Sequence, residues 1–64
     1  MSVKRGKFVK YLEENSCYFH RHGSKHDIFK NEITGKKTTI PRHPKLDPFL
    51  CDLICKQLDI PQID

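Results

Sequence analysis

The stretch that decides the fold is His22-Gly23-Ser24-Lys25-His26-Asp27-Ile28-Phe29, which combines a turn signal with strand-forming segments. Its Gly-Ser pair favours a tight reversal of the chain. Residues 17–22 before the pair and 26–30 after it have the composition of strands, and residues 37–40 form a third such segment beyond a second turn signal at 31–35. Because short turns join antiparallel neighbours, the sequence predicts a three-stranded antiparallel sheet.

The face on which His26 lies depends on the register of the second strand. Side chains alternate across a strand, so His26, Ile28 and Lys30 share one face while Asp27 and Phe29 share the other. If Phe29 anchors the core, His26 faces outward together with Lys30. The opposite register buries His26 beside Ile28, and the sequence leaves both registers open.

A first helix is predicted at residues 4–15, where apolar side chains recur at helical spacing: Phe8, Val9 and Leu12, with Tyr11 beside them. Its first residues include Lys4, Arg5 and Lys7, and positive charges at a helix N-terminus oppose the helix dipole. Two explanations remain open. The basic helix start binds phosphate groups, or it is a solvated and screened terminus.

A second helix is predicted from residue 48 to about residue 58. Asp47 is a suitable N-cap, Pro48 suits the first helical position, and one face carries an apolar stripe: Cys51, Ile54, Cys55 and Leu58. The apolar arc extends further, to Phe49 and Leu53. We interpret these two residues as a surface for a protein partner. Alternatively, both pack onto the core against Tyr11 or the C-terminal isoleucines.

The length and charge of the chain limit its function. The chain has 64 residues, with 12 Lys and Arg against 8 Asp and Glu, and its formal net charge is +4. Residues 1–64 therefore make one domain with a thin core, and any active site lies on an open surface that suits a polymer substrate. The basic balance favours a nucleic-acid partner, although solubility alone also explains such a charge.

Neither a membrane span nor a metal site is expected. No apolar run is long enough for a signal peptide or a membrane-spanning helix, which indicates an intracellular protein. Three cysteines are an odd number, so we expect small buried thiols rather than a disulfide framework. Cys51 and Cys55 stand one helical turn apart, but Cys17 lies on a strand and no Cys-x-x-Cys completes a zinc site.

The order helix, three strands, helix, together with its motifs, resembles the HicA family of bacterial and archaeal toxins. The resemblance covers nearly the whole chain. It rests on an ordered set of short segments: Lys4-Arg5, Leu12-Glu13-Glu14-Asn15, Gly23 to Phe29, Thr34-Gly35-Lys36, Ile40-Pro41-Arg42-His43 and Lys56-Gln57-Leu58. The chain departs from the usual pattern at Ser16 and Asp59, where glycine is common, and at Cys51 and Cys55, where leucine-like residues are common.

The resemblance implies an α+β fold like that of a double-stranded-RNA-binding domain, αβββα, with a three-stranded antiparallel sheet and both helices on one of its faces. It implies a cytoplasmic toxin of a toxin-antitoxin system that cuts mRNA without a metal or another cofactor. The family's catalytic histidine corresponds to His26. A HicB-type antitoxin silences the family by covering its active surface. In this chain, we expect an acidic antitoxin to bury His26 and the basic face and to anchor on Phe49 and Leu53.

The chemistry follows from elementary considerations as well. In metal-free RNA cleavage the 2′-hydroxyl attacks the neighbouring phosphate, so a catalyst must take one proton, give another and stabilise negative charge. An imidazole with an ordinary pKa of about 6.5 suits both proton transfers at cellular pH. His43 is a candidate for the second transfer, or it caps the loop before the second helix. The residues expected to bind RNA are Gly23, Ser24, Lys25, Lys30, Arg42 and His43.

Two other functions compete with a ribonuclease. A non-catalytic RNA-binding module would use the same basic face for shape recognition. A DNA-binding domain is disfavoured because neither predicted helix carries a basic stripe suited to the major groove.

Overall fold

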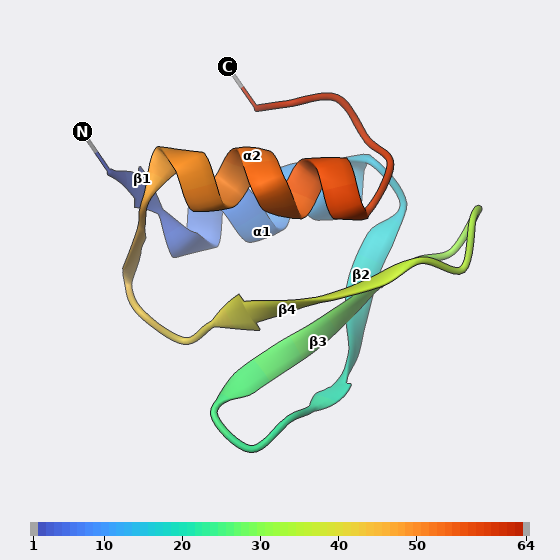
Figure 1. Ribbon diagram of the computed structural model, residues 1–64, viewed down its shortest axis with the longest axis horizontal. Helices are drawn as coiled ribbons and strands as arrows, with labels where there is room; N and C mark the ends of the chain where they lie inside the picture. The colour runs from blue at the N-terminus through green and yellow to red at the C-terminus, as the bar shows by residue number, and fades with distance from the viewer. Residues whose placement is uncertain (1, 64) are drawn as a thin grey trace.

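The computed structural model describes residues 2–63 and has the predicted order of helices and strands (Figure 1). The main sheet is antiparallel, with strand order β2-β3-β4, and α1 and α2 flank it in the sequence. This is the αβββα arrangement of a double-stranded-RNA-binding domain. The elements in chain order are β1 (Val3–Lys4), α1 (Arg5–Glu14), β2 (Cys17–His22), β3 (His26–Asn31), β4 (Lys37–Pro41), β5 (Lys45–Leu46) and α2 (Pro48–Gln57).

A second, two-stranded sheet was not predicted. β1 pairs antiparallel with β5, with Val3 opposite Leu46 and Lys4 opposite Lys45. The backbone N–H of Arg5 also donates to the carbonyl oxygen of Pro44 at 2.9 Å. These contacts join the start of α1 to the segment that leads into α2, so the two helices begin side by side at one end of the molecule (Figure 1).

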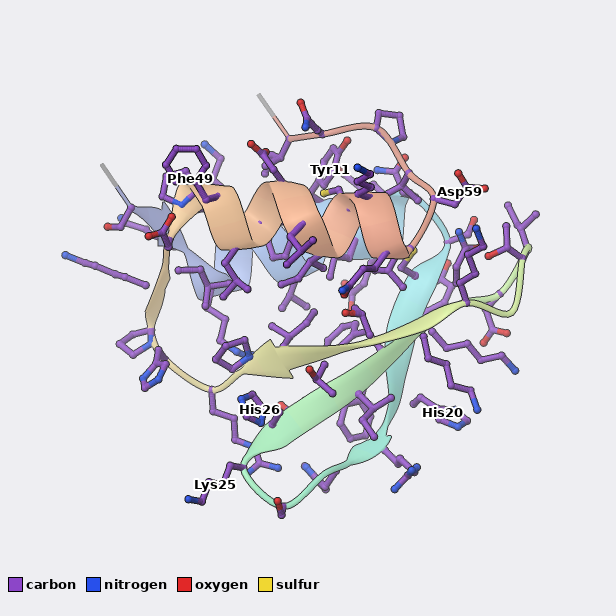
Figure 2. The ribbon with its side chains drawn as sticks, in the orientation of Figure 1. Tyr11, His20, Lys25, His26, Phe49 and Asp59 are labelled. Carbon is purple, nitrogen blue, oxygen red and sulfur yellow. The ribbon has the colours of Figure 1, made fainter. Side chains whose placement is uncertain are left out.

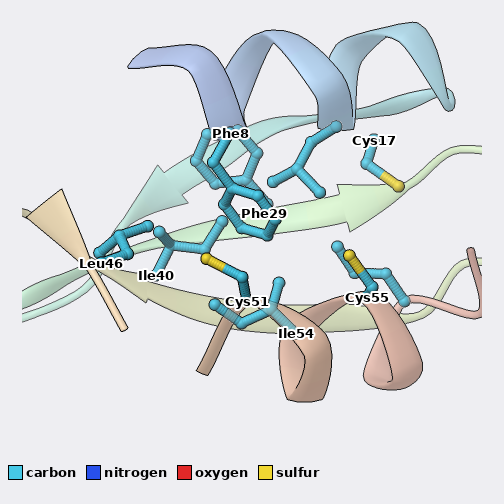
Figure 3. Packing of buried hydrophobic residues seen from close by; sticks show 10 residues of the cluster. Phe8, Cys17, Phe29, Ile40, Leu46, Cys51, Ile54 and Cys55 are labelled. Carbon is cyan, nitrogen blue, oxygen red and sulfur yellow. The ribbon is translucent and has the colours of Figure 1, made fainter. Parts of the chain in front are cut away.

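The hydrophobic core lies between the two helices and the sheet (Figure 3). All three cysteines are buried in it as free thiols, as predicted. Burial, reinforced by the neighbouring Cys55, raises the pKa of the Cys51 thiol to about 11, which keeps it protonated at neutral pH. The core residues are Phe8, Leu12, Cys17, Phe29, Ile40, Leu46, Cys51, Ile54, Cys55 and Leu58.

The outward register of His26 is confirmed. Phe29 is only 3% exposed, and the residues on its face of β4, Thr38 and Ile40, are buried as well. Because side chains alternate along β3, His26 lies on the opposite face, which the helices leave free, and it is exposed. Along β2 the register shifts between Phe19 and Arg21, which marks a β-bulge that the sequence did not predict.

Both helices end on a residue in the left-handed backbone region that favours glycine. Ser16 has φ 65° after α1, and Asp59 has φ 60° after α2. At α2 the N–H of Ile60 donates to the oxygen of Cys55 at 3.0 Å and that of Asp59 donates to the oxygen of Lys56 at 3.2 Å, which is the Schellman pattern. These are the two positions where the sequence departs from glycine.

Replacing Asp59 or Ser16 by glycine is expected to stabilise the protein by about 0.5–1 kcal/mol per site. Glycine removes the strain of the left-handed backbone in the folded state, and this gain exceeds the entropy that glycine adds to the unfolded chain. The thermal midpoint should rise by roughly 2–8 °C, measured by circular dichroism. The control is Lys10→Gly at an exposed helical position, which should lower stability by about 1 kcal/mol. If Asp59→Gly lowered the stability of the protein as much as Lys10→Gly does, strain at Asp59 would be contradicted.

Asn31 connects the end of β3 to the end of α2. Its side chain is buried, and its amide Nδ2 donates to the carbonyl oxygen of Leu58 at 2.7 Å. Its Oδ1 accepts from the backbone N–H groups of Ile33 at 2.8 Å and Thr34 at 3.3 Å. One amide therefore organises the turn between β3 and β4 and satisfies a carbonyl at the C-terminus of α2.

Candidate active site

The turn between β2 and β3 favours a glycine at residue 23. The backbone N–H of Gly23 donates to the carbonyl oxygen of His26 at 2.7 Å. A Cβ atom at this position would stand 3.0 Å from the same oxygen, and a backbone atom cannot yield as the end of a flexible side chain can. The close contact favours glycine at residue 23, and it involves only the backbone of residue 26, so it does not select the His26 side chain.

His26 is the first residue of β3 and lies opposite Pro41 of β4. Its side chain is exposed, and it forms no hydrogen bond or ion pair with another side chain in residues 2–63. Figure 2 shows His26 and Lys25 at the same end of the sheet, with Lys25 at the tip of the hairpin. The imidazole is therefore accessible to a ligand that approaches the free face.

Asp27 is the centre of an ion-pair cluster that the sequence did not predict. Its carboxylate accepts a hydrogen bond from Arg5 Nη2 at 2.8 Å and another from Arg42 Nε at 2.9 Å. His22 Nδ1 lies 3.0 Å from the same carboxylate, and the Asp27 side chain is 13% exposed. The hydrogen bonds from Arg42 and then His22 lower the pKa of the Asp27 carboxyl below its usual value. The only signal for this cluster was one acidic residue within a basic motif.

Arg42 and Arg5 extend the cluster to the backbone around His26. Nη2 of Arg42 donates to the carbonyl oxygens of Gly23 and His26, each at 3.1 Å. Nε of Arg5 donates to the oxygen of Pro41 at 2.8 Å. We call Arg5, Asp27 and Arg42 the arginine clamp. It joins the start of α1, the β2–β3 turn and the end of β4, and so it fixes the backbone that carries His26.

Neither sequence-based explanation of the basic helix start holds for Arg5, because its guanidinium is bound to Asp27 and Pro41 and its side chain is 23% exposed. Lys4 and Lys7 are exposed, as both explanations require. The proposed contact of Arg42 with phosphate stays a prediction, with its Nε and one Nη already engaged in the clamp.

The stability provided by the clamp should depend on pH. The pKa of Asp27 is lower in the folded protein than the value of about 3.9 in an unfolded chain. Its contribution is therefore complete above about pH 4 and is lost as the pH falls through the folded-state pKa. We expect the difference in unfolding free energy between the parent and Asp27→Asn to be largest near neutrality and to shrink on acidification.

Chemical denaturation from pH 7 down to pH 2 measures this difference. The matched control is Asp52→Asn, since Asp52 forms no ion pair in residues 2–63. A difference between parent and Asp27→Asn that stayed constant across the whole range would contradict the assignment.

The other predicted RNA-binding residues divide into two groups. Gly23, Ser24 and Lys25 lie in the turn beside His26, and His43 is exposed on the loop that follows Pro41. Lys30 shares the free face with His26 but stands four residues further along β3, which is about 14 Å at strand spacing. The structure thus separates Lys30 from the immediate surroundings of the imidazole.

A comparison with known protein families agrees with this arrangement. The family model described as HicA toxin of bacterial toxin-antitoxin matches residues 5–60, which is most of the chain. The chain belongs to the HicA toxin family. No curated protein and no solved structure matches it in the corresponding searches. As a HicA-family member it is the toxin of a toxin-antitoxin system.

Two absences hold for the part of the chain that the structure describes. No helix in residues 2–63 has both the length and the apolar character needed to cross a membrane. The same residues contain no cluster of three or more His, Cys, Asp or Glu side chains that is arranged to hold a metal ion.

The two apolar residues predicted to contact the antitoxin are exposed on α2. Phe49 is 83% and Leu53 is 50% exposed, so the alternative in which both pack onto the core is wrong. Tyr11 instead donates through its hydroxyl to the oxygen of Pro61 at 2.6 Å. Figure 2 shows Phe49 at the start of α2, in the helix layer, whereas His26 lies on the sheet. An antitoxin that covers both sites would have to reach around the edge of the sheet.

Proposed function

We propose that this toxin is a metal-independent ribonuclease that cleaves mRNA in the cytoplasm with His26 as its general acid or base. The observation that carries the proposal is the exposed imidazole of His26 on the free face of the sheet, on a turn whose backbone is held by Gly23 and Arg42. Membership of the HicA family supports the same reading.

In the proposed reaction the 2′-oxygen of a ribose attacks the adjacent phosphorus, and the bond from phosphorus to the 5′-oxygen of the next nucleotide breaks. As a base, His26 takes the proton from the 2′-hydroxyl. As an acid, it gives a proton to the departing 5′-oxygen. The products are a 2′,3′-cyclic phosphate and a 5′-hydroxyl. This step requires no metal and no external redox partner.

The surroundings of His26 suit a negatively charged transition state. Lys25 stands next to it in the turn and is exposed. Gly23 closes the turn through its N–H bond to the oxygen of His26, and this turn leaves Ser24 and Lys25 exposed to a phosphate. We assign phosphate contacts to this group of Gly23, Ser24, Lys25 and Arg42, and keep His43 as the candidate for the second proton transfer.

We also propose that a HicB-type antitoxin inhibits the toxin by covering His26 and the basic face, with Phe49 and Leu53 as apolar anchors. Aromatic side chains such as Phe49 are enriched in protein interfaces, and the neighbouring exposed Leu53 extends the apolar patch. Their exposure on α2 supports this assignment.

The decisive experiment is cleavage of a single-stranded RNA by the purified toxin in excess EDTA. We expect fragments that end in a 2′,3′-cyclic phosphate, and no cleavage at a site where the 2′-hydroxyl is replaced by hydrogen. Binding of the RNA without any cleavage would instead favour the non-catalytic RNA-binding module. Cleavage at the deoxy site would contradict attack by the 2′-oxygen.

A further inference from the structure

The free face of the sheet presents its side chains in cross-strand rows. The first row pairs His26 with Pro41, and the second places Arg21, Ile28 and Thr39 side by side. The third row consists of Tyr18, Lys30 and Lys37 from the three strands. None of the side chains in these three rows is acidic.

The third row contains an unfavourable charge pair. Lys30 lies directly opposite Lys37 on neighbouring strands, and like charges in this position destabilise a sheet. The ion pairs found in residues 2–63 all involve Asp27, which lies on the other face, so neither lysine is neutralised by a carboxylate. Glu32, the next residue after β3, forms no ion pair in this part of the chain either. A polyanion lying across the row would remove the repulsion.

Tyr18 completes the row with an aromatic ring. It is 45% exposed and lies beside Lys30 on the edge strand β2. An exposed aromatic ring on a sheet, next to cations, is the combination by which proteins stack an unpaired base while they bind the adjoining phosphates. A base inside a duplex cannot stack on it in this way, because its faces are already covered by neighbouring bases.

We propose that the free face of the sheet is a track for single-stranded RNA that leads from His26 to the row of Tyr18, Lys30 and Lys37. The inference rests on the proposed ribonuclease function and names the form of its substrate. Lys30 stands four positions after His26 on β3, which is about 14 Å, enough for a few nucleotides. Lys30 and Lys37 bind phosphates away from the cleaved bond, and Tyr18 stacks on a base.

The test measures binding separately from cleavage. Every variant is made in a His26→Ala background, and its affinity for a fluorescent single-stranded RNA is measured by anisotropy at several salt concentrations. Lys37→Glu is compared with Lys10→Glu, which makes the same charge change at an exposed position on α1. We expect Lys37→Glu to weaken binding about tenfold or more beyond the control, since it removes a charge-assisted contact.

Two further readouts separate the track from a general loss of positive charge. The dependence of log affinity on log salt should become less steep by about 0.7 in Lys37→Glu relative to the control, as expected for one lost phosphate contact. Lys37→Glu should also raise the thermal midpoint, because an opposite charge now faces Lys30. Weaker RNA binding in a more stable protein cannot come from a damaged fold.

Tyr18 is tested by a matched pair of substitutions. Tyr18→Ala should weaken binding by roughly five- to a hundredfold, whereas Tyr18→Phe, which keeps the ring, should bind as the parent does. Duplex RNA of the same sequence should compete poorly with the single strand.

The outcomes distinguish the track from the proposed function. Equal losses in Lys37→Glu and Lys10→Glu, or no loss in Tyr18→Ala, would overturn the track even if the parent toxin cleaves RNA. If Lys37→Glu instead impaired only antitoxin binding, the face would belong to the protein partner and the track would be excluded. A parent toxin that binds RNA along these residues without cutting it would overturn the ribonuclease and support the track.

Discussion

A His26→Ala variant is expected to lose RNA cleavage by roughly a hundred- to ten-thousandfold, the usual contribution of one positioned acid or base. Its fold and its RNA affinity should be retained, because the imidazole is exposed and forms no side-chain hydrogen bond in residues 2–63. The measurements are the initial rate of RNA decay in EDTA, the thermal midpoint and RNA binding by anisotropy.

The control for this variant is His20→Ala, an exposed histidine in the irregular part of β2. It loses the same side chain at a position outside the β2–β3 turn, and its cleavage rate should stay within about twofold of the parent. If His26→Ala cut RNA as fast as the His20→Ala control, the assignment of the general acid or base to His26 would be wrong.

An Asn31→Ala variant is expected to lose about 3 kcal/mol of unfolding free energy, because a buried carbonyl at Leu58 and a turn N–H at Ile33 lose their partner together. For a chain of this size the total stability is only about 3–10 kcal/mol. The thermal midpoint should therefore fall by roughly 12–24 °C, which circular dichroism will measure.

Asn15→Ala is the matched control. Asn15 also donates through its side-chain amide to a backbone carbonyl, that of Tyr11 at 2.9 Å. Its side chain forms no second hydrogen bond within residues 2–63, and the group is only partly buried. We expect a loss of about 1 kcal/mol there. If Asn31→Ala and Asn15→Ala lost the same unfolding free energy, the bonds of Asn31 to Leu58 and Ile33 would stabilise the fold no more than the single bond of Asn15.

Sequence patterns predicted the five main elements because each pattern is local. The second helix was marked by its cap, and the side chain of Asp47 does accept from the N–H of Phe49 at 2.8 Å. The strand limits followed from turn residues, and β3 begins at His26 as predicted. The family resemblance marked Ser16 and Asp59 as positions where glycine is common, and these are the two non-glycine residues with positive φ in residues 2–63.

The features that were missed depend on residues distant in sequence. The two-residue pairing of β1 with β5 carries too little periodicity to be recognised before the chain is folded. The register of His26 required the burial of Phe29, which alternation alone does not determine. The arginine clamp joins residues up to 36 positions apart, and no local pattern identifies which arginine meets a given carboxylate.

That separation affects the order in which the hairpin and its clamp form during synthesis. A ribosome releases Arg5 and the Gly23 turn before Arg42. A growing chain therefore contains the β2–β3 hairpin before it contains the Arg42 side chain, which donates to the carbonyl oxygens of Gly23 and His26. Until β4 and Arg42 have emerged, the backbone that carries the His26 imidazole lacks these two hydrogen bonds. The sequence distance across the clamp thus sets a lower limit on the length of chain that can hold this turn in its final geometry.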